Sequence, residues 1–263
     1  MIVRGADELQ DPGWPRPSGG LAERLLLEPI SAQTFTIHRL IRGMLAEHGA
    51  GPEHVLRQNV YVCSMAQLPE VERIARSFYP ERPPAATVIG IESLAHSDFL
   101  IEIEVITCAS APLRPAPVHA RVARWGHHAS VVRGGDLVYT AALLGYDPVR
   151  NKVVMEPANL ERRSAETVHQ AISGLCVTTR GQIAAAAQTQ SILDQLAATL
   201  AALDSGLRDL LKITVYLRDM DEFEFVRRVL MHSLGADPPA ISVLAVAELP
   251  LSQARVQIEA VAR

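Results

Sequence analysis

The sequence predicts an α+β fold made of two copies of one small domain, each a mixed β-sheet covered on one face by two helices. The first observation is an internal repeat, because residues 33–108 align without a gap onto residues 188–263 at an offset of 155. Val60-Tyr61, for example, falls on Val215-Tyr216. A repeat this long is not a solenoid unit, which spans roughly 20–50 residues, so it indicates a duplicated domain. The second observation is the order of periodic segments in the second copy, ββαβαββ.

The second copy shows the elements most clearly, beginning with a hairpin. Residues 128–132 and 137–143 are rich in β-formers, and Gly134-Gly135-Asp136 between them is typical of a hairpin turn. A helix is expected over 188–203, where apolar residues recur at helical spacing. These residues are Ile192, Leu193, Leu196, Leu200 and Leu203.

The remaining elements of the copy follow in order. Alternation of apolar and polar residues predicts a strand over 211–217. Asp221 is a suitable N-cap for a second helix, which Pro238-Pro239 ends. Two final strands are expected over 241–246 and 255–262. The first copy repeats this pattern as αβαββ from Gln33 onward.

The repeat sets the expected domain boundaries. Residues 1–109 form a first domain with an eroded N-terminal hairpin, residues 110–120 form a proline-rich linker, and residues 121–263 form a second, complete domain. Residues 155–180 interrupt the second copy between its hairpin and its first helix. An insertion of this kind is either a functional loop, such as a lid, or tolerated surface.

Composition excludes several classes of partner. A net charge of −4 gives no basic footprint for nucleic acid. No apolar run approaches the ~18 residues of a membrane span, and the first residues lack the apolar region of a secretion signal. The three cysteines, Cys63, Cys108 and Cys176, fit neither a disulfide framework nor a zinc site. These features predict a cytoplasmic protein without nucleic-acid or membrane partners.

No cofactor or metal is expected either. The histidines other than 127 and 128 are scattered without metal-ligand spacing. The sequence also lacks a Gly-rich phosphate loop and a Gly-x-Ser-x-Gly nucleophile elbow. Chemistry at a site would therefore depend on the side chains of the protein itself.

Several short motifs in the second copy carry a resemblance to a known family. They are Gly135-Asp136-Leu137-Val138-Tyr139, Ala187-Gln188-Thr189, Lys212-Ile213-Thr214-Val215-Tyr216 and Ile258-Glu259-Ala260-Val261-Ala262. In these motifs the second copy closely resembles the RidA/YjgF family, whose best-known members are imine and enamine deaminases. The match covers nearly all of 121–263 apart from the insertion, and most of 33–109. The resemblance implies the fold described above and subunits that associate around clefts.

The chain departs from the family where deaminases bind the carboxylate of the substrate. The family has an arginine after Pro-Ala, and this chain has Ala86 in one copy and Ile241 in the other. The family cysteine two residues later is Val88 and Val243. Because a charge-assisted pair contributes about 1.5–3 kcal/mol, an amino-acid-derived imine should bind poorly here. We expect these four apolar residues to line a cleft for an apolar or aromatic substrate without a carboxylate.

Two histidines and two glutamates are the candidate catalytic groups. His128 stands at the family tyrosine, so it is the candidate acid or base, with His127 beside the substrate. The alternative is a pair of surface histidines. Glu104 and Glu259 stand where the resemblance implies a glutamate near the ligand, and the alternative is an outward-facing strand residue.

Aromatic residues supply further candidates for binding the substrate. Trp125 and Tyr139 are placed to stack on a flat molecule, although aromatics beside a hairpin are more often core. Arg227 and Glu72 occupy equivalent helix positions where the family often has asparagine, and both are expected to be solvated.

These expectations lead to a cofactor-independent acid/base enzyme that acts on a reactive apolar or aromatic enamine, imine or quinone-like intermediate of a biosynthetic pathway. The expected reaction is cyclisation, tautomerisation or dehydration. One alternative is hydrolytic deamination of an imine without a carboxylate, and another is a non-catalytic ligand-binding or regulatory protein. The resemblance further implies a homo-oligomer, a trimer or a dimer.

Overall fold

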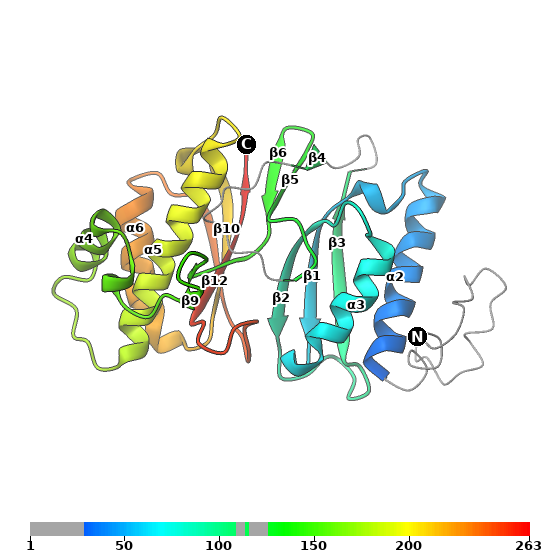
Figure 1. Cartoon of the computed structure of the whole chain (residues 1–263), viewed down its shortest axis with the longest axis horizontal. Coiled ribbons are helices and arrows are strands. Elements are labelled where there is room, and N and C mark those ends of the chain that lie inside the picture. Colours follow the sequence, from blue (N-terminus) through cyan, green and yellow to red (C-terminus); the bar gives the residue numbers. More distant parts are fainter. Residues whose placement is uncertain (1–28, 109–113, 116–125) are drawn as a thin grey trace.

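The computed structural model describes residues 29–108, 114–115 and 126–263. The expected strand and proline-rich arm at the N-terminus, the rest of the linker and Trp125 lie outside these residues. Figure 1 shows two sheets in the centre of the molecule and helices on the two outer sides. The two copies therefore face each other through their sheets.

The first copy has the predicted order αβαββ. Its sheet has the strand order β2-β1-β3, in which β1 pairs in parallel with β2 and antiparallel with β3. The elements are α2 (Pro29–Glu47), β1 (Val55–Val62), α3 (Leu68–Phe78), β2 (Ala85–Gly90) and β3 (Ile101–Thr107). Parallel pairing of β1 and β2 follows from the helix α3 that connects them.

The second copy contains the predicted elements and several short strands. Its larger sheet has the order β11-β10-β12-β6-β5-β4, and β7 pairs with the N-terminal half of β12. The strands of this sheet are β4 (Arg114–Pro115), β5 (Val131–Gly134), β6 (Leu137–Thr140), β7 (Leu143–Leu144), β10 (Leu210–Leu217), β11 (Ala240–Ala245) and β12 (Val256–Ala262). Two residues of the expected linker thus form an edge strand.

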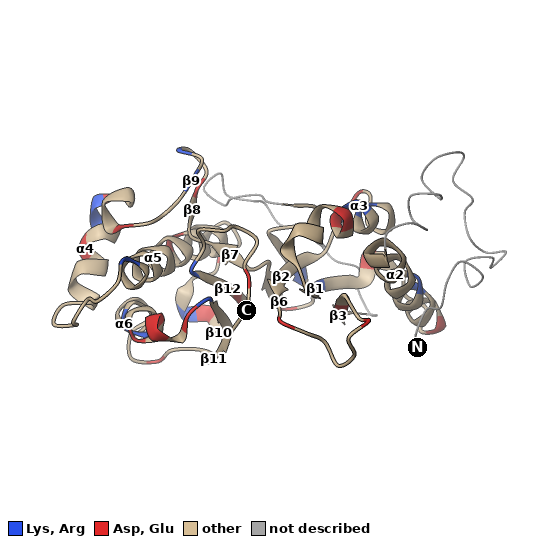
Figure 2. Ribbon diagram, turned by 90° about the horizontal axis from the view of Figure 1, so that it is seen from below, with Lys and Arg blue, Asp and Glu red and all other residues tan. Residues whose placement is uncertain are grey.

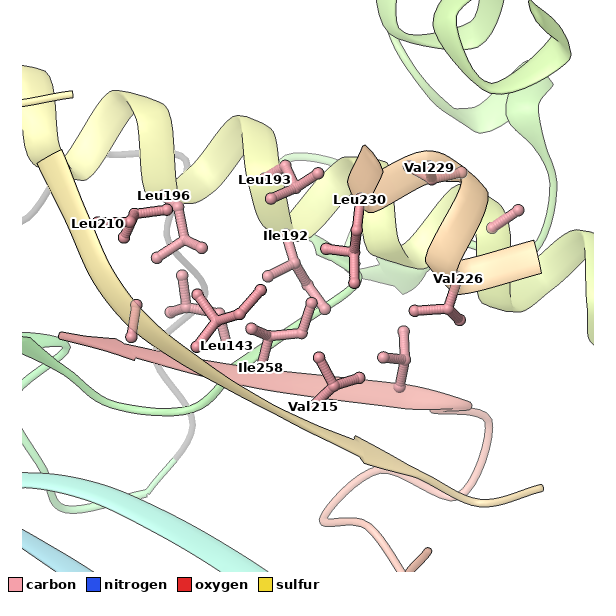
Figure 3. Packing of buried hydrophobic residues seen from close by; sticks show 14 of the residues in the cluster. Leu143, Ile192, Leu193, Leu196, Leu210, Val215, Val226, Val229, Leu230 and Ile258 are labelled. Atoms are coloured by element: carbon pink, nitrogen blue, oxygen red, sulfur yellow. The ribbon is translucent and has the colours of Figure 1, made fainter. Parts of the chain in front are cut away.

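Helices α5 (Arg180–Ala201) and α6 (Phe223–Leu234) cover the outer face of this sheet. Apolar side chains of both helices pack against strands β10 and β12, as Figure 3 shows for Leu196, Leu230, Val215 and Ile258. All four are buried. This cluster is the core that fixes the second sheet.

Helix α5 begins eight residues before the predicted start. Thr179 caps it, since its hydroxyl accepts a hydrogen bond from the Gln182 backbone N–H. The added first turns carry four consecutive buried alanines, 184–187. Because a run of alanines has no amphipathic period, the pattern analysis missed these turns.

The insertion 155–180 is a packed structure on the outer side. It contains the 3₁₀ turn η4 (Pro157–Asn159) and helix α4 (Arg162–Ala171). Val168 of α4 is fully buried in the core cluster of the second copy. Figure 1 shows α4 outside α6, on the side of the copy opposite the first sheet.

Candidate active site between the two copies

Strand β2 of the first copy is where the second copy docks. All six of its residues are buried. The Ala129 N–H donates to the Pro84 carbonyl at 2.9 Å, and the Ala142 N–H donates to the Ala86 carbonyl at 3.2 Å. The hairpin of the second copy therefore runs along β2 through backbone contacts.

Glu259 lies at the centre of this interface. Its side chain is 3% exposed, and its Oε1 is 3.3 Å from Nη2 of Arg57, which belongs to the first copy. The Thr87 hydroxyl of β2 donates to Oε2 of the same carboxylate. The Tyr216 hydroxyl is a third hydrogen-bond partner, and burial, together with the charge of Glu259, raises the pKa of this phenol. The carboxylate is thus held from both copies.

Arg57 has a second contact across the interface. Its guanidinium carbon is 5.9 Å from the centre of the Tyr139 ring, within the range of a cation–π contact. Tyr139 therefore lies beside the Arg57–Glu259 pair. It belongs to β6, which pairs with β12 at Val261.

Glu104 occupies the equivalent position in the first copy and has different surroundings. Its side chain is exposed. Asn59 Nδ2 donates to it at 2.9 Å, and the Tyr61 hydroxyl donates to it at 3.4 Å. Burial and then the charge of Glu104 raise the pKa of Tyr61, and Glu259 adds to this effect. Tyr61 therefore lies within the electrostatic reach of both glutamates.

The segment before the hairpin contacts α3 of the first copy. His127 Nε2 is 2.7 Å from the Tyr79 carbonyl oxygen, so this nitrogen carries the proton and donates. The His127 backbone N–H donates to the carboxyl group of Glu72, whose pKa is raised by burial. Gly126 has φ +79°, a conformation that favours glycine, and a Cβ there would displace the Glu72 carboxylate, whose Oε1 lies 1.9 Å from the Cβ position.

His128 follows directly in this segment. Burial, and then the charge of neighbouring His127, lowers its pKa to about 4. The imidazole is therefore neutral at pH 7 and is a base rather than an acid there. Glu72, expected to be a solvated helix position, is instead half-buried under this segment.

The four apolar residues at the family's arginine and cysteine positions are not brought together. Ala86 and Val88 lie on interface strand β2 and are buried, Val88 in the core cluster of the first copy. Ile241 and Val243 lie on β11, at the opposite edge of the second sheet from the hairpin. Ile241 is 37% exposed, and Val243 packs against the core of its own copy.

A pocket of about 690 Å³ opens between the copies beyond the C-terminal end of β2. It is lined by Ile91 and Glu92 of the first copy and by Arg218 and Val246 of the second. Arg218 places a guanidinium at this pocket. None of the site residues predicted from the sequence lines this pocket.

Sequence reasoning missed Arg57, Thr87 and Tyr216, although the repeat contains a signal for them. Polar residues at every second position of β1, and one polar residue each of β2 and β3, have polar counterparts 155 residues later. The pairs are Arg57 and Lys212, Asn59 and Thr214, Tyr61 and Tyr216, Thr87 and Ser242, and Glu104 and Glu259. A face that stays polar in two copies of a buried strand indicates a second contact surface.

Within the described ranges, no group of three or more His, Cys, Asp or Glu side chains is arranged to hold a metal ion. No helix among these residues is long and apolar enough to cross a membrane. Figure 2 shows Lys and Arg interspersed with Asp and Glu in both halves of the described structure.

Known proteins similar to this chain were found by sequence and by structure. A family model described as Endoribonuclease L-PSP matches residues 17–109 and 168–263. RutC family protein UK114 of Drosophila melanogaster is 41% identical over 75 residues, which are 28% of this chain and 54% of the fly protein. RutC family protein PH0854 of Pyrococcus horikoshii is 36% identical over 75 residues, 28% of this chain and 59% of that protein. The chain thus spans little more than half the length of these two relatives.

A third relative is matched over more of its length. The 2-iminobutanoate/2-iminopropanoate deaminase of Dermatophagoides farinae is 24% identical over 152 residues, which are 58% of this chain and 91% of that protein. Among solved structures, RidA from an Antarctic Psychrobacter species has a TM-score of 0.43 at 23% identity, covering 57% of this chain and 98% of that one. Yeast Mmf1 has a TM-score of 0.41 at 22% identity, covering 57% and 97%.

The two matched segments of the family model coincide with the two copies of the internal repeat and make up more than half of the chain. The chain therefore belongs to the RidA/YjgF family, which includes imine and enamine deaminases, as a tandem member that lacks the family arginine in both copies.

Proposed function

We propose that the interface between the two copies is the active site of a cofactor-independent enzyme that transfers protons on a carboxylate-free imine or enamine, interconverting its tautomers or promoting its cyclisation or dehydration. The observation that carries the proposal is that a neutral, partly exposed His128 and the buried carboxylate of Glu259 both lie where the second copy docks on the first. Both groups lie along the same strand, β2, of the first copy.

Glu259 is poorly suited to activating water. Arg57, Thr87 and Tyr216 bind its two oxygens, which leaves about one of its roughly four acceptor positions for a hydrolytic water. Its role in the proposal is to position Arg57 and Tyr216 beside the substrate. Glu104, by contrast, is exposed and held only by Asn59 and Tyr61.

His128 supplies the base in this proposal. Its neutral imidazole takes a proton from the carbon beside the imine, and the protonated ring delivers this proton to the imine nitrogen, which gives the enamine. Proton transfer by a positioned side chain contributes typically 10²–10⁴-fold. The Tyr139 ring, which is partly exposed and contacts Arg57, offers a flat, electron-rich surface for a conjugated substrate.

The substrate class follows from Ala86 and Val88. Neither side chain can pair with a carboxylate, so β2 lacks the cation that the family has there, although Val88 itself packs into the core of the first copy. We therefore propose an apolar or aromatic substrate that lacks a carboxylate at this end. Ile241 and Val243, on β11, would not contribute to this site within one chain.

One observation favours the hydrolytic alternative. Arg218 lines the pocket between the copies, so a carboxylate-bearing imine could be held there instead. The similarity to the deaminase of Dermatophagoides farinae points the same way. In that case ammonia would be released, and the water would be directed by a group other than Glu259.

The test compares two imines, one derived from an aryl methyl ketone and one from pyruvate. We expect deuterium exchange at carbon in the first, with slow release of ammonia from the second. His128→Phe should lower the exchange rate at least 10²-fold, whereas His232→Phe, at an exposed position of helix α6, should not change it. The wild-type rate should be constant above pH 5.5 and fall as the pH approaches 4, because only neutral His128 is active.

Faster release of ammonia from the pyruvate imine would favour the deaminase, especially if Arg218→Met abolished it. Binding of both compounds without turnover of either would favour the non-catalytic alternative. An exchange rate that His128→Phe leaves unchanged would contradict the role of His128.

A further inference from the structure

The contact between the two copies has a cationic side and an acidic side. The cationic side belongs to the first copy, where Arg57 of β1 and Thr87 of β2 bind one carboxylate. The acidic side belongs to the second copy, where β12 carries that carboxylate, Glu259. Because both copies repeat one domain, the chain contains a further side of each kind, which this contact does not use.

The second copy has a cationic side of its own, and it is open to solvent. Its residues are Lys212 and Ser242, the counterparts of Arg57 and Thr87, and both are exposed. Leu244 lies two residues after Ser242, on the same face of β11, and is 49% exposed. Its counterpart in the first copy, Ile89, is 4% exposed, because it packs in a cluster with residues of the second copy. An exposed leucine beside an unused lysine marks a surface that fits a partner.

The first copy has an acidic side of its own, and it is open as well. Glu104 is exposed and is held by Asn59 and Tyr61 of its own copy. Both hydrogen bonds go to Oε2, and among the described residues none is donated to Oε1. Tyr61 is the counterpart of Tyr216, which binds Glu259. Glu104 thus has the contacts that come from its own copy, and the contacts from a facing copy are missing within the described ranges.

The two open sides are complementary in charge, but one chain does not bring them together. No ion pair joins Glu104 to Lys212 in the described part of the chain. Figure 2 shows β3 and β11 on the same, lower side of the molecule, so one partner can meet both strands. A second chain carries the side that each strand lacks.

We propose that two copies of this chain form a dimer, in which Glu104 of each chain binds Lys212 and Ser242 of the partner subunit. This contact repeats between chains what Glu259 does with Arg57 and Thr87 within one chain. A two-fold axis makes the contact twice, so both open sides of both chains are used. The partner thereby supplies the carboxylate that the cationic side of the second copy lacks.

The contact between chains should be weaker than the contact within a chain. Within the chain, the hairpin of the second copy adds backbone hydrogen bonds to the Pro84 and Ala86 carbonyls. That hairpin is already used there, so the contact between chains depends on side chains. We therefore expect a dimer with a micromolar dissociation constant.

Sedimentation velocity of the full chain at about 50 μM and pH 7 tests the proposal, and we expect a dimer. Glu104→Lys and Lys212→Glu each place like charges at both contacts, so either should weaken dimerisation at least 10²-fold and give monomers. The matched controls are Glu166→Lys on helix α4 and Lys152→Glu on β9 (Lys152–Val153), which make the same changes of charge at exposed positions elsewhere. Both controls should remain dimers.

A mixture of the two monomeric variants gives the decisive result. When Glu104→Lys and Lys212→Glu are combined in equal amounts, each contact again joins opposite charges, and we expect the dimer to return. Both variants keep a net negative charge, so overall attraction between them does not explain its return, and recovery shows that both are folded.

Four results would overturn the proposal. The first is a wild-type chain that is monomeric or forms an assembly of more than two chains. The second is a dimer that survives Glu104→Lys, because β11 would then pair with β11 of the partner. The third is a mixture that stays monomeric, and the fourth is a control variant that dissociates.

Discussion

Substitution of the two equivalent glutamates tests whether the Arg57–Glu259 pair joins the copies. Glu259→Gln leaves a guanidinium, 7% exposed, between the sheets without its charged partner. At 3.3 Å and an effective dielectric constant of about 20, the lost attraction is about 5 kcal/mol. Removing one partner of a buried ion pair costs about 3–5 kcal/mol in measured cases, so we expect a loss in this range.

Glu104→Gln is the matched control, because residue 104 is the counterpart of residue 259 in the repeat. Its exposed side chain keeps a hydrogen-bonding amide, so the free energy of unfolding should change by no more than about 1 kcal/mol. Urea unfolding followed by circular dichroism measures both variants. We further expect the single transition to broaden or divide into two in Glu259→Gln, since the copies lose part of their contact.

A third variant separates the loss of an interaction from the burial of an unpaired charge. Arg57→Met combined with Glu259→Gln removes both charges and keeps an apolar chain of similar length. This double variant should be more stable than Glu259→Gln alone. If Glu259→Gln and Glu104→Gln lowered stability equally, or if the double variant were the least stable of the three, the pair would not have the role assigned to it.

Three further predictions concern the core, a close backbone approach and the insertion. Burial lowers the pKa of His38 and that of His128 from 6.5 to about 4. Between pH 6.5 and pH 4 the unfolded chain therefore binds more protons than the folded chain, so the free energy of unfolding should fall as the pH drops through this window. Each histidine contributes up to about 3 kcal/mol, and His38→Leu should flatten the plot of thermal midpoint against pH; an unchanged slope would contradict this. Gly145→Ala should lower the free energy of unfolding by about 1–3 kcal/mol, because a Cβ there lies 2.5–2.6 Å from Cβ and Cα of Gln188. Gly43→Ala, on helix α2 where nothing lies within 4 Å of the added Cβ, should raise it by about 0.5–1 kcal/mol in the same urea titration. Val168→Ala in α4 should lower the free energy of unfolding by about 2 kcal/mol, because Val168 is fully buried. Val177→Ala, at a position of the same insertion that is 47% exposed, should have little effect. Equal urea midpoints for the two variants would show that α4 is not part of the core.

The repeat made the fold predictable, because the order of strands and helices in one copy had to serve both. Strand 211–217 and the helix after Asp221 were located within about one or two residues, since alternation is a local signal. The predicted N-cap was wrong, because Asp219, and not Asp221, caps the 3₁₀ turn that precedes α6, by accepting a hydrogen bond from the Asp221 N–H. The start of α5 was missed because its buried alanines show no period. The insertion gave no indication of where its helix would pack, since its contacts with α5 and α6 are tertiary.

The candidate site was less predictable than the fold. A motif placed His128 and Glu259 in one copy, but their surroundings come from the other copy. His127 contacts the carbonyl of Tyr79, and Glu259 contacts Arg57, at sequence separations of 48 and 202 residues. Such contacts depend on how two sheets face each other, which local spacing does not encode. The sign of the His128 pKa shift likewise follows from burial, which is a tertiary property.

The two copies differ most at one pair of equivalent strands, and this difference explains why the proposed site lies at β2 and not at its counterpart β11 among the described residues. Strand β2 is buried over its whole length, while β11 is exposed at all positions except the half-buried Val243. Lys212 and Ser242 are the counterparts of Arg57 and Thr87 in the repeat, and both are exposed. Among the described residues, no carboxylate binds them as Glu259 binds Arg57 and Thr87. The polar face of the second copy, around Lys212 and Ser242, therefore has similar side chains but forms no interface among the described residues. The homo-oligomer expected from the resemblance stays a prediction, and β11, with Leu244 49% exposed, is the surface through which we expect it to form.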